Sequence, residues 1–500
     1  MRKLLLVLFL IFLGSENIFS FWNGKFFIEI FPVARLSTRN FHTEPIDQLY
    51  YLSYFNQQRI LNTGIDLEWK GLHLYLAIDI FRDLIFDSIN FGYSNIPMTP
   101  AGLANSVNNN WPTVSYLEYR HDIIELSLGR RGFAMGYGDY GLALSPTAPY
   151  FDGFWLGLKP PVGKGKLFYY FAAFADDRLA NENYLQHNEK IWNDNHPASS
   201  EKNPFSYQQI SKWYFNHKIG YAGANWRFGI SESSVIYGVP VILWNANPFT
   251  FWHNLYERGM NVSFGISGEA IFDKIRIYGE FLLDDVRLTV EGDMANPSAF
   301  GIYIGVDYHV LDNQGYQGHI YGSRAHVKHE ESFAYQGGGL LLSWQFILAT
   351  SYLYSRSIYD PYGKLTMMNN IRGEGGDKVI EYFIGSPYGP DSIVFEFSTR
   401  YEQPNWYFLG HMALQLQGRH GYDGFYSDAT GWQAQGLYDP SRTSDWFFSS
   451  IRHVNLHISM QIYYLLASWC SLYAGWESRL MLNNIQQSRS TIETGVAMRF

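Results

Sequence analysis

The sequence predicts an all-β fold, a transmembrane antiparallel β-barrel of about 18 strands with long extracellular loops. Three observations lead to this prediction. The chain opens on an export signal, segments of about ten residues alternate between apolar and polar or small side chains, and short turns alternate with long polar loops. The composition agrees, because 18% aromatic residues and 46 glycines favour strands and turns over helices.

The export signal occupies the first residues of the chain. Met1-Arg2-Lys3 is a short basic start, and Leu4–Leu13 is an unbroken apolar run. A run of about ten residues is too short to span a bilayer comfortably, but it matches the core of a secretory signal. We therefore expect residues 1–20 to be a signal peptide and residues 21–500 to form one barrel domain. An uncleaved membrane anchor is the alternative.

Alternation with a period of two is clearest in the segments 300–310, 454–466 and 491–500. In the first, Phe300, Ile302, Ile304 and Val306 share one face, and Gly301, Tyr303, Gly305, Asp307 and His309 share the other. A half-buried strand has this pattern. The length of about ten residues is that of a transmembrane strand, whereas strands of soluble sandwiches are nearer five or six residues long.

Connection lengths test the barrel independently. Very short turns are expected after Lys70, Arg120, Phe272, Arg400 and Ala467. Long polar loops separate the hairpins, at 83–113, 131–152, 176–215, 239–260, 357–390 and 419–450. Bacterial barrels have short periplasmic turns and long outer loops, so both termini are assigned to the periplasm. Residues 311–345 are too many for an inner turn, and we expect a periplasmic or lumenal insertion there.

Charge, cysteine content and motifs exclude several functional classes. The net charge is −9 and no Lys/Arg run occurs, so nucleic acid is not an expected partner. The one cysteine, Cys470, cannot form an intramolecular disulfide. No nucleophile–base motif, phosphate loop or zinc motif occurs, so we expect no enzyme, no cofactor and no metal. His319, His326 and His329 gather in the insertion, but their spacing matches no tight ligand motif.

The stretch YGEFLLDD at 278–285 raises the question of paired catalytic carboxylates. On a strand from Lys274 to Asp284, the residues Arg276, Glu280 and Asp284 face the lumen. Glu280 and Asp284 then lie roughly 13 Å apart. Glycosidase carboxyl groups are about 5 Å apart in retaining enzymes and about 6.5–9.5 Å apart in inverting enzymes. The pair therefore predicts a lumenal ladder of charges, although a hydrolase assembled across several strands stays open.

Five segments, taken in order, resemble the Wzi-type capsule assembly family of outer-membrane proteins. They are residues 128–154 (LGRRGFAMGYGDYGLALSPTAPYFDGF), 212–217 (KWYFNH), 229–238 (GISESSVIYG), 278–285 and 384–392 (IGSPYGPDS). The first resembles the family's G-R…W-G-P-G…L-L-L-S-x-x-A-P-P-F-D region, and the last resembles its G-x-P-L-G-x-x-x-G-P-D-S region. Met135-Gly136-Tyr137-Gly138 replaces the W-G-P-G core. The family's N-terminal helical bundle has no counterpart, because residues 26–36 alternate as a strand.

The resemblance implies a plugged 18-stranded barrel in the bacterial outer membrane that binds, attaches or organises surface polysaccharide in a lectin-like way. The other expected partners are outer-membrane lipid and the barrel assembly machinery, and the expected state is a monomer. A porin or solute-selective channel is the alternative function, and an in-barrel hydrolase is the third.

The candidate ligand-binding residues come from three places. Arg130, Arg131, Tyr137 and Asp152 belong to a Gly-rich outer loop that could fold into the lumen; arginine forks would grip acidic sugar groups there, or the glycines simply permit a plug loop to turn. Trp244 and Trp252 lie in an aromatic outer loop that stacks on sugars or joins the interfacial girdle. Arg276, Glu280 and Asp284 supply the lumenal ladder.

Overall fold

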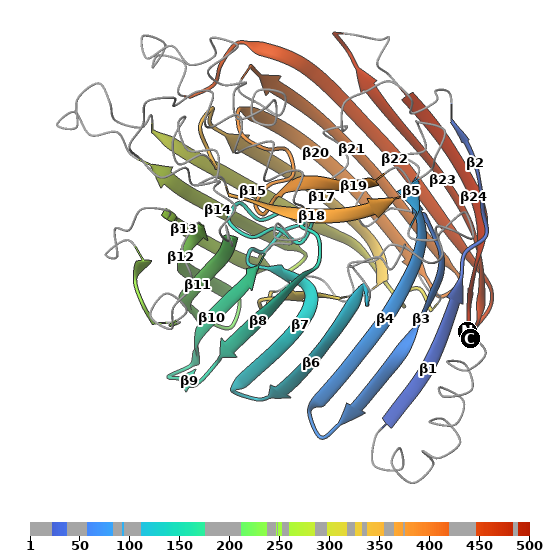
Figure 1. Cartoon of the computed structure of the whole chain (residues 1–500), viewed down its shortest axis with the longest axis horizontal. Coiled ribbons are helices and arrows are strands. Elements are labelled where there is room, and N and C mark those ends of the chain that lie inside the picture. The colour runs from blue at the N-terminus through green and yellow to red at the C-terminus, as the bar shows by residue number, and fades with distance from the viewer. Residues whose placement is uncertain are drawn as a thin grey trace.

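In the computed structural model a single antiparallel sheet closes on itself as a barrel (Figure 1). The structure describes residues 23–37, 58–83, 93–94, 112–175, 212–237, 247, 249–252, 260–285, 298–317, 326–332, 338–354, 365–373, 376–419, 447–483 and 489–500. The signal peptide expected at residues 1–20 lies outside these residues. Within them, no helix is long and apolar enough to cross a membrane.

The barrel wall has 18 strands when β1 and β2 are counted as one strand and the short β5, β9 and β16 are left out. In order around the wall they are β1 (Asn23–Ile30) with β2 (Val33–Ser37), β3 (Gln58–Trp69), β4 (Leu72–Asp83), β6 (Val114–His121), β7 (Ile124–Ala134), β8 (Phe151–Leu158), β10 (Gly165–Ala175), β11 (Lys212–Ala222), β12 (Trp226–Tyr237), β13 (Met260–Phe272), β14 (Ile275–Asp285), β15 (Ala299–Asn313), β17 (Gly338–Ala349), β20 (Ser392–Gln403), β21 (Trp406–Gly418), β22 (Ile451–Ala467), β23 (Cys470–Met481) and β24 (Arg489–Arg499). The short strands are β5 (Tyr93–Ser94), β9 (Pro161–Val162) and β16 (Val327–His329).

The first and last strands close the ring. Glu29 of β1 pairs with Arg499 of β24, and Val33 of β2 pairs with Gly495 of the same strand. The break between β1 and β2 falls at Phe31-Pro32, because proline has no N–H to give to the ladder. The predicted antiparallel barrel is confirmed.

The predicted alternation is confirmed on the walls. On β15, Ile304 is exposed on the outer face while its neighbour Tyr303 is buried inside. On β14, Ile275, Ile277 and Phe281 are exposed. Outward aromatic pairs lie near the short turns, with Trp406 against Tyr464 (ring centroids 4.5 Å apart) and Trp469 against Phe500 (5.6 Å). This arrangement is typical of the aromatic girdle at one membrane boundary.

The short turns gather at one end of the barrel, as predicted. The β3–β4 turn uses Lys70 (φ 45°) and Gly71 (φ 85°), both in the left-handed conformation that a tight hairpin needs. Two boundaries differ from the prediction. Strand β7 continues to Ala134 and β8 begins at Phe151, so the loop between them is residues 135–150. Strands β15 and β17 reach Asn313 and Gly338, so the segment between them is shorter than 311–345.

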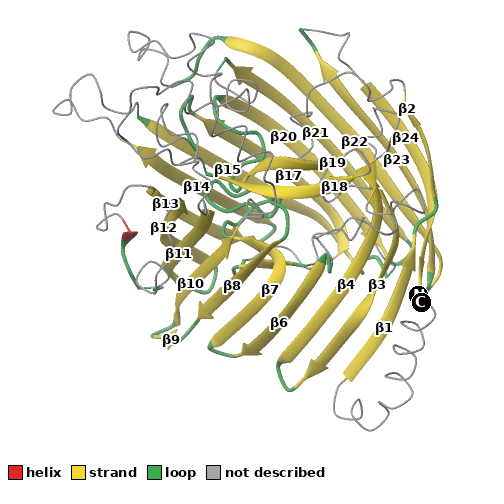
Figure 2. Cartoon of the chain, viewed as in Figure 1, coloured by secondary structure: helices red, strands yellow, loops and turns green. Residues whose placement is uncertain are grey.

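Loops fill much of the lumen (Figure 2). The loop 135–150, hereafter the plug loop, is buried along most of its length, as are residues 350–354 and 384–391 from the β17–β20 connection. A hairpin of β18 (Thr366–Gly373) and β19 (Gly376–Phe383) extends from the same connection across the barrel towards β5 (Figure 1). The largest buried core therefore lies inside the barrel, between its wall and these loops.

Candidate functional site

Glu280, the acidic residue of YGEFLLDD, holds the plug loop. Strand β14 directs its carboxylate into the lumen, where it accepts hydrogen bonds from the backbone N–H groups of Leu142 (2.8 Å) and Ala143 (3.2 Å). A carboxylate that accepts two backbone N–H groups makes charge-assisted bonds, which are stronger than neutral ones. Both oxygens of Glu280 are thus engaged by the plug loop.

The other segments that carry the family resemblance meet at the same junction. Tyr214 of β11 donates its hydroxyl to the carbonyl of Ala143 (2.7 Å), and Asn216 donates to the Tyr214 oxygen (3.1 Å). The backbone N–H of Ser145 donates to the carbonyl of Ile384 (2.7 Å). Val235 of β12 is fully buried in the same core. Five segments spread over residues 128–392 therefore interlock in one place.

Arg276 fastens the first part of the plug loop. Its guanidinium donates to Glu269 (3.0 Å), to Asp307 (2.7 Å) and to the carbonyl oxygen of Tyr137, and it lies over the ring of Tyr278. On the other side of the plug loop, the Lys218 Nζ is 4.2 Å from the centroid of the Tyr137 ring. Burial raises the pKa of the Tyr137 hydroxyl, so this group stays neutral. Arg276 and Tyr137 thus both take part in packing the plug.

A second element enters the lumen from the short-turn end. Strand β16 pairs in parallel with residues 132–134 of β7. Around it, the Lys328 Nζ contacts Glu118 (2.6 Å) and Glu125 (3.0 Å), Lys218 contacts Glu330 (2.6 Å), and Lys159 contacts Glu331 (2.7 Å). Charges of the segment 326–332 are thus matched by opposite charges on the wall. Burial raises the pKa of the Glu330 carboxyl, and the Lys218 ammonium opposes this effect.

The beginning of the same connection is fixed to the opposite side of the wall. The N–H of Gln317 donates to the carbonyl of Pro404 (3.1 Å), and the Tyr316 hydroxyl donates to Ser471 (2.8 Å). The Tyr316 ring lies 6.1 Å from Tyr407 between centroids. The described parts of the β15–β17 connection therefore contact two distant parts of the barrel wall at the short-turn end.

A row of imidazole–carboxylate pairs lines the wall from β20 to β23. His411 pairs with Glu396 (2.9 Å) and His457 with Glu477 (3.0 Å), and the two imidazole rings are 5.1 Å apart. Arg479 donates to Glu477 (2.6 Å). Alternation alone assigns His457 to the polar face, but the pairing with Glu477 depends on the register of β22 and β23, which the sequence does not reveal.

The two neighbouring arginines of the predicted site face opposite sides of the wall. Arg130 lies on the outer face and donates to Asp152, its register partner on β8 (Nε to Oδ1, 3.3 Å). Arg131 points into the lumen, where it donates to Glu118 (3.0 Å) and Ser127 (3.1 Å). These residues belong to strands and not to a loop, so the two arginines do not converge on one ligand.

The other residues of the predicted site do not come together at one place in the described structure. Asp284 accepts a hydrogen bond from the N–H of Tyr354 (2.8 Å), so it and Glu280 bind the backbone of different loops. Trp252 is fully buried against the wall and not exposed. Trp244 and His319 lie outside the described residues. Among the residues that are described, no group of three or more His, Cys, Asp or Glu side chains is arranged to hold a metal ion.

Comparison with known proteins supports the fold. No family model and no curated protein matches the chain. Among solved structures it is similar to Wzi, a carbohydrate-binding β-barrel involved in group 1 capsule assembly in Escherichia coli, with a TM-score of 0.51 and 11% identity over 95% of this chain and 84% of that one. It also matches Pseudomonas aeruginosa OccK3 (TM-score 0.43, 8% identity, 98% of each chain) and OccK5 (0.42, 6%, 96% and 98%). At 11% identity, the match to Wzi shows the outer-membrane β-barrel fold alone.

Proposed function

We propose that this chain is an exported bacterial outer-membrane barrel that binds or organises surface polysaccharide at its outer end, as a lectin more than as a pore. The interlocked plug carries this proposal. The segments that resemble the Wzi-type family form the junction at Glu280, where they fill this part of the lumen. A general porin needs an open path through this space, whereas a polysaccharide-binding barrel does not.

The surface of the barrel supports its insertion in a membrane. Outward residues on neighbouring strands are apolar, as Phe281 and Ile304 illustrate, and aromatic pairs mark the short-turn end. Short turns on the periplasmic side and long loops outside follow the general pattern of bacterial barrels. The long loops would then face surface polysaccharide.

Among the described candidates, Arg130 and Asp152 form an ion pair in which the Arg130 side chain is 13% exposed. Asp152 is 61% exposed in its side chain, and both residues lie on the outer face of the wall. An arginine fork here would bind a carboxylate of an acidic polysaccharide, competing with Asp152. Each such contact is modest, but contacts repeated along a chain of sugars add together.

Retention of an acidic polysaccharide by the protein in vesicles tests the proposal. Arg130→Ala should weaken retention, and added salt should reproduce part of that loss in the parent. Arg120→Ala is the matched control, because Arg120 is an exposed arginine near the short-turn end. Unfolding must stay near that of the parent in both variants. Equal retention by the parent and by Arg130→Ala would remove this residue from the site.

A solute-selective channel is the second candidate function. The imidazole–carboxylate row of His411, Glu396, His457 and Glu477 favours it, since polar groups inside a barrel suit a path for polar solutes, and the side chains of His411, His457 and Glu477 are 16%, 13% and 28% exposed. A hydrolase built from these groups is the third candidate. Conductance across a planar bilayer separates the channel from the polysaccharide-binding barrel.

A further inference from the structure

A hydrogen-bonded imidazole–carboxylate pair lies on the outer face of the wall, at a height where lipid is expected. On β11, Tyr214 and Lys218 contact lumenal groups, so the intervening His217 points outwards. Its register partner on β12 is Glu232. The two side chains are joined by a 3.0 Å contact and are 9% and 3% exposed.

The height of this pair follows from the apolar residues nearer to the short turn. Outward residues of β12 begin with Trp226, which contacts Tyr221 at the short-turn end, and continue with Phe228 and Ile230, both exposed. Glu232 is six residues from Trp226, or roughly 15 Å along the barrel axis for a strand tilted by about 40°. The apolar band of such barrels is about 25 Å tall, so Glu232 falls inside it.

A short segment of the β12–β13 loop covers the pair. Trp252 is 0% exposed, and its N–H donates to the Glu232 carboxylate (3.1 Å). Its ring centroid is 4.5 Å from that of His217 and 5.8 Å from that of Phe215. With Phe171 and Met260 it forms a separate buried cluster, distinct from the core inside the barrel. The residues 249–252, hereafter the outer flap, thus fold down over the outside of the wall.

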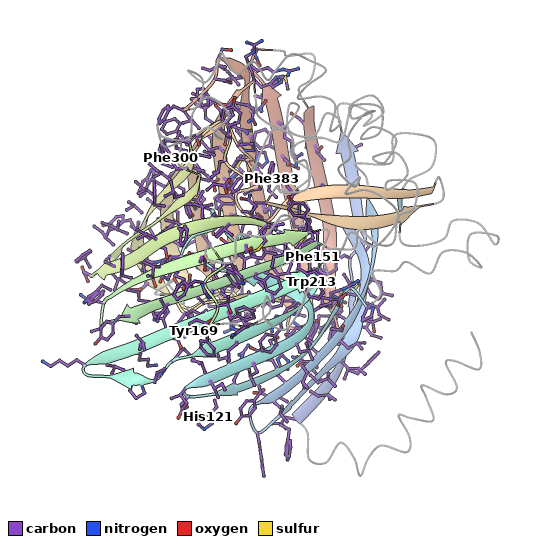
Figure 3. The ribbon with its side chains drawn as sticks, turned by 60° about the vertical axis from the view of Figure 1, so that its left-hand side comes forward. His121, Phe151, Tyr169, Trp213, Phe300 and Phe383 are labelled. Atoms are coloured by element: carbon purple, nitrogen blue, oxygen red, sulfur yellow. The ribbon has the colours of Figure 1, made fainter. Side chains whose placement is uncertain are left out.

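The outer flap presents phenylalanine rings to the surroundings. Phe249 and Phe251 are 67% and 65% exposed. Phe249 stacks on Tyr169 of β10 (5.5 Å between centroids), and Phe251 meets His217 edge-on (5.7 Å). Figure 3 labels Tyr169 and Trp213 on this part of the wall. The segment Phe249-Thr250-Phe251-Trp252 carries no charge, and its rings add to the apolar surface of Ile230 and Phe264.

We propose that the outer flap lies within the outer membrane, where Phe249 and Phe251 contact acyl chains and Trp252 seals the His217–Glu232 pair from lipid. The inference rests on the membrane location of the barrel, but not on its ligand. We assign lipid as the neighbour of the outer flap because its exposed rings continue the apolar band of β12. A bare carboxylate at this height is costly in hydrocarbon, which explains why Trp252 covers Glu232. The flap therefore contacts lipid and not polysaccharide.

Spin labelling tests this assignment, since the chain has one native cysteine. In a Cys470→Ala background, a nitroxide is attached at Phe249→Cys or at Phe251→Cys, and the protein is reconstituted in phosphatidylcholine–phosphatidylglycerol vesicles. Collisions with oxygen, which concentrates in lipid, are compared with collisions with a water-soluble nickel chelate. Ile304→Cys on the outer face of β15 is the lipid control, and Lys164→Cys in the exposed β9–β10 turn is the water control.

Labels at 249 and 251 should match the label at 304, with oxygen favoured over the nickel chelate. If these labels match the label at 164 while the label at 304 remains lipid-like, the flap does not lie in lipid, but the barrel still spans the membrane. Water-like signals at 304 as well would overturn the membrane location itself. Exclusion of both reagents at 249 and 251 would indicate a protein neighbour and reject lipid as the occupant.

A second pair of variants tests the seal. Trp252→Ala should release the flap and shift the label at 251 towards the nickel chelate. Trp226→Ala removes another outward tryptophan, near the short-turn end of β12, and should leave the label unchanged. An unchanged label in Trp252→Ala would contradict the role of Trp252 as the contact that holds the flap.

Discussion

The two sides of the lumen are stabilised in different ways. On the side of β6–β14, segments from elsewhere in the chain bring partners to the wall: plug-loop amides bind Glu280, and Glu330 pairs with Lys218. On the side of β20–β23, His457 pairs with Glu477 of the neighbouring wall strand, although Glu396 of β20 also accepts a hydrogen bond from Tyr388 of the β17–β20 connection (2.9 Å). The difference indicates that the first side holds the plug in place, whereas the second side can lose a pair at little cost.

The largest effect is expected from Lys218→Met. Lys218 and Glu330 are 2% and 1% exposed, so the variant leaves a buried carboxylate without its ammonium. Removing one partner of a buried pair costs about 3–5 kcal/mol. The free energy of unfolding, measured by denaturant titration in lipid, should fall by that amount. The double variant Lys218→Met/Glu330→Gln should recover part of it, and a fully additive loss would contradict the pairing.

The loss of stability in Lys218→Met should depend on pH. Burial raises the pKa of the Glu330 carboxyl above its unfolded value, so its protonated form is favoured by folding. Its contribution to stability is therefore present below the unfolded pKa and is lost as pH rises through the folded pKa. Without Lys218 this pKa rises further, so the deficit of Lys218→Met should shrink as the solution is made acidic. A deficit that grows on acidification would reject this explanation.

An intermediate effect is expected from arginine on the outer face of the second side. Met460 of β22 is exposed outwards and lies four residues from the Tyr464–Trp406 pair, whereas its neighbour Gln461 points inwards. Arginine on the lipid face near the midplane costs about 2–4 kcal/mol. Met460→Arg should therefore lower the free energy of unfolding by that amount, and Gln461→Arg should cost much less. Equal penalties would mean that the inward and outward assignments are wrong.

A smaller loss of stability is expected when one carboxylate on each side of the lumen is changed to an amide, and the two losses compare the sides directly. Glu280→Gln keeps one acceptor but points an NH2 group at a plug-loop amide, which costs about 1–3 kcal/mol. Glu477→Gln, on the second side, retains an oxygen acceptor for His457 and Arg479, and since Glu477 is 28% exposed the variant should cost about 1 kcal/mol or less. Denaturant titration of both variants checks the order. A larger loss for Glu477→Gln would reverse the comparison.

The sequence predicted the wall well because the pleat of a strand fixes the period of two, and residues such as Ile304 and Tyr303 follow it. The lumenal orientation of Glu280 was predicted for the same reason. Its partners were not, because Leu142 and Ala143 are 138 and 137 residues away and join it only when the plug loop folds inwards.

Arg131 and Trp252 show where the sequence misleads. Glycines around Arg131 suggested a loop, although β7 continues through it, and the strand sends Arg130 and Arg131 to opposite faces. For Trp252, an aromatic residue in an outer loop has the same local sequence whether it faces sugar or folds onto the wall. Its contact with His217, 35 positions earlier, exists only in the closed barrel.

Planar-bilayer conductance tests the central claim, a lumen closed by the plug, most directly. The purified parent protein is compared with a variant in which a short Gly-Ser linker replaces residues 136–149, so that β7 and β8 are still connected. The parent should show no large, stable unitary steps, because the plug loop fills the lumen beside Glu280. The shortened variant, provided that it folds, should show them. Large and stable steps from the parent would contradict the closed lumen and favour the solute channel.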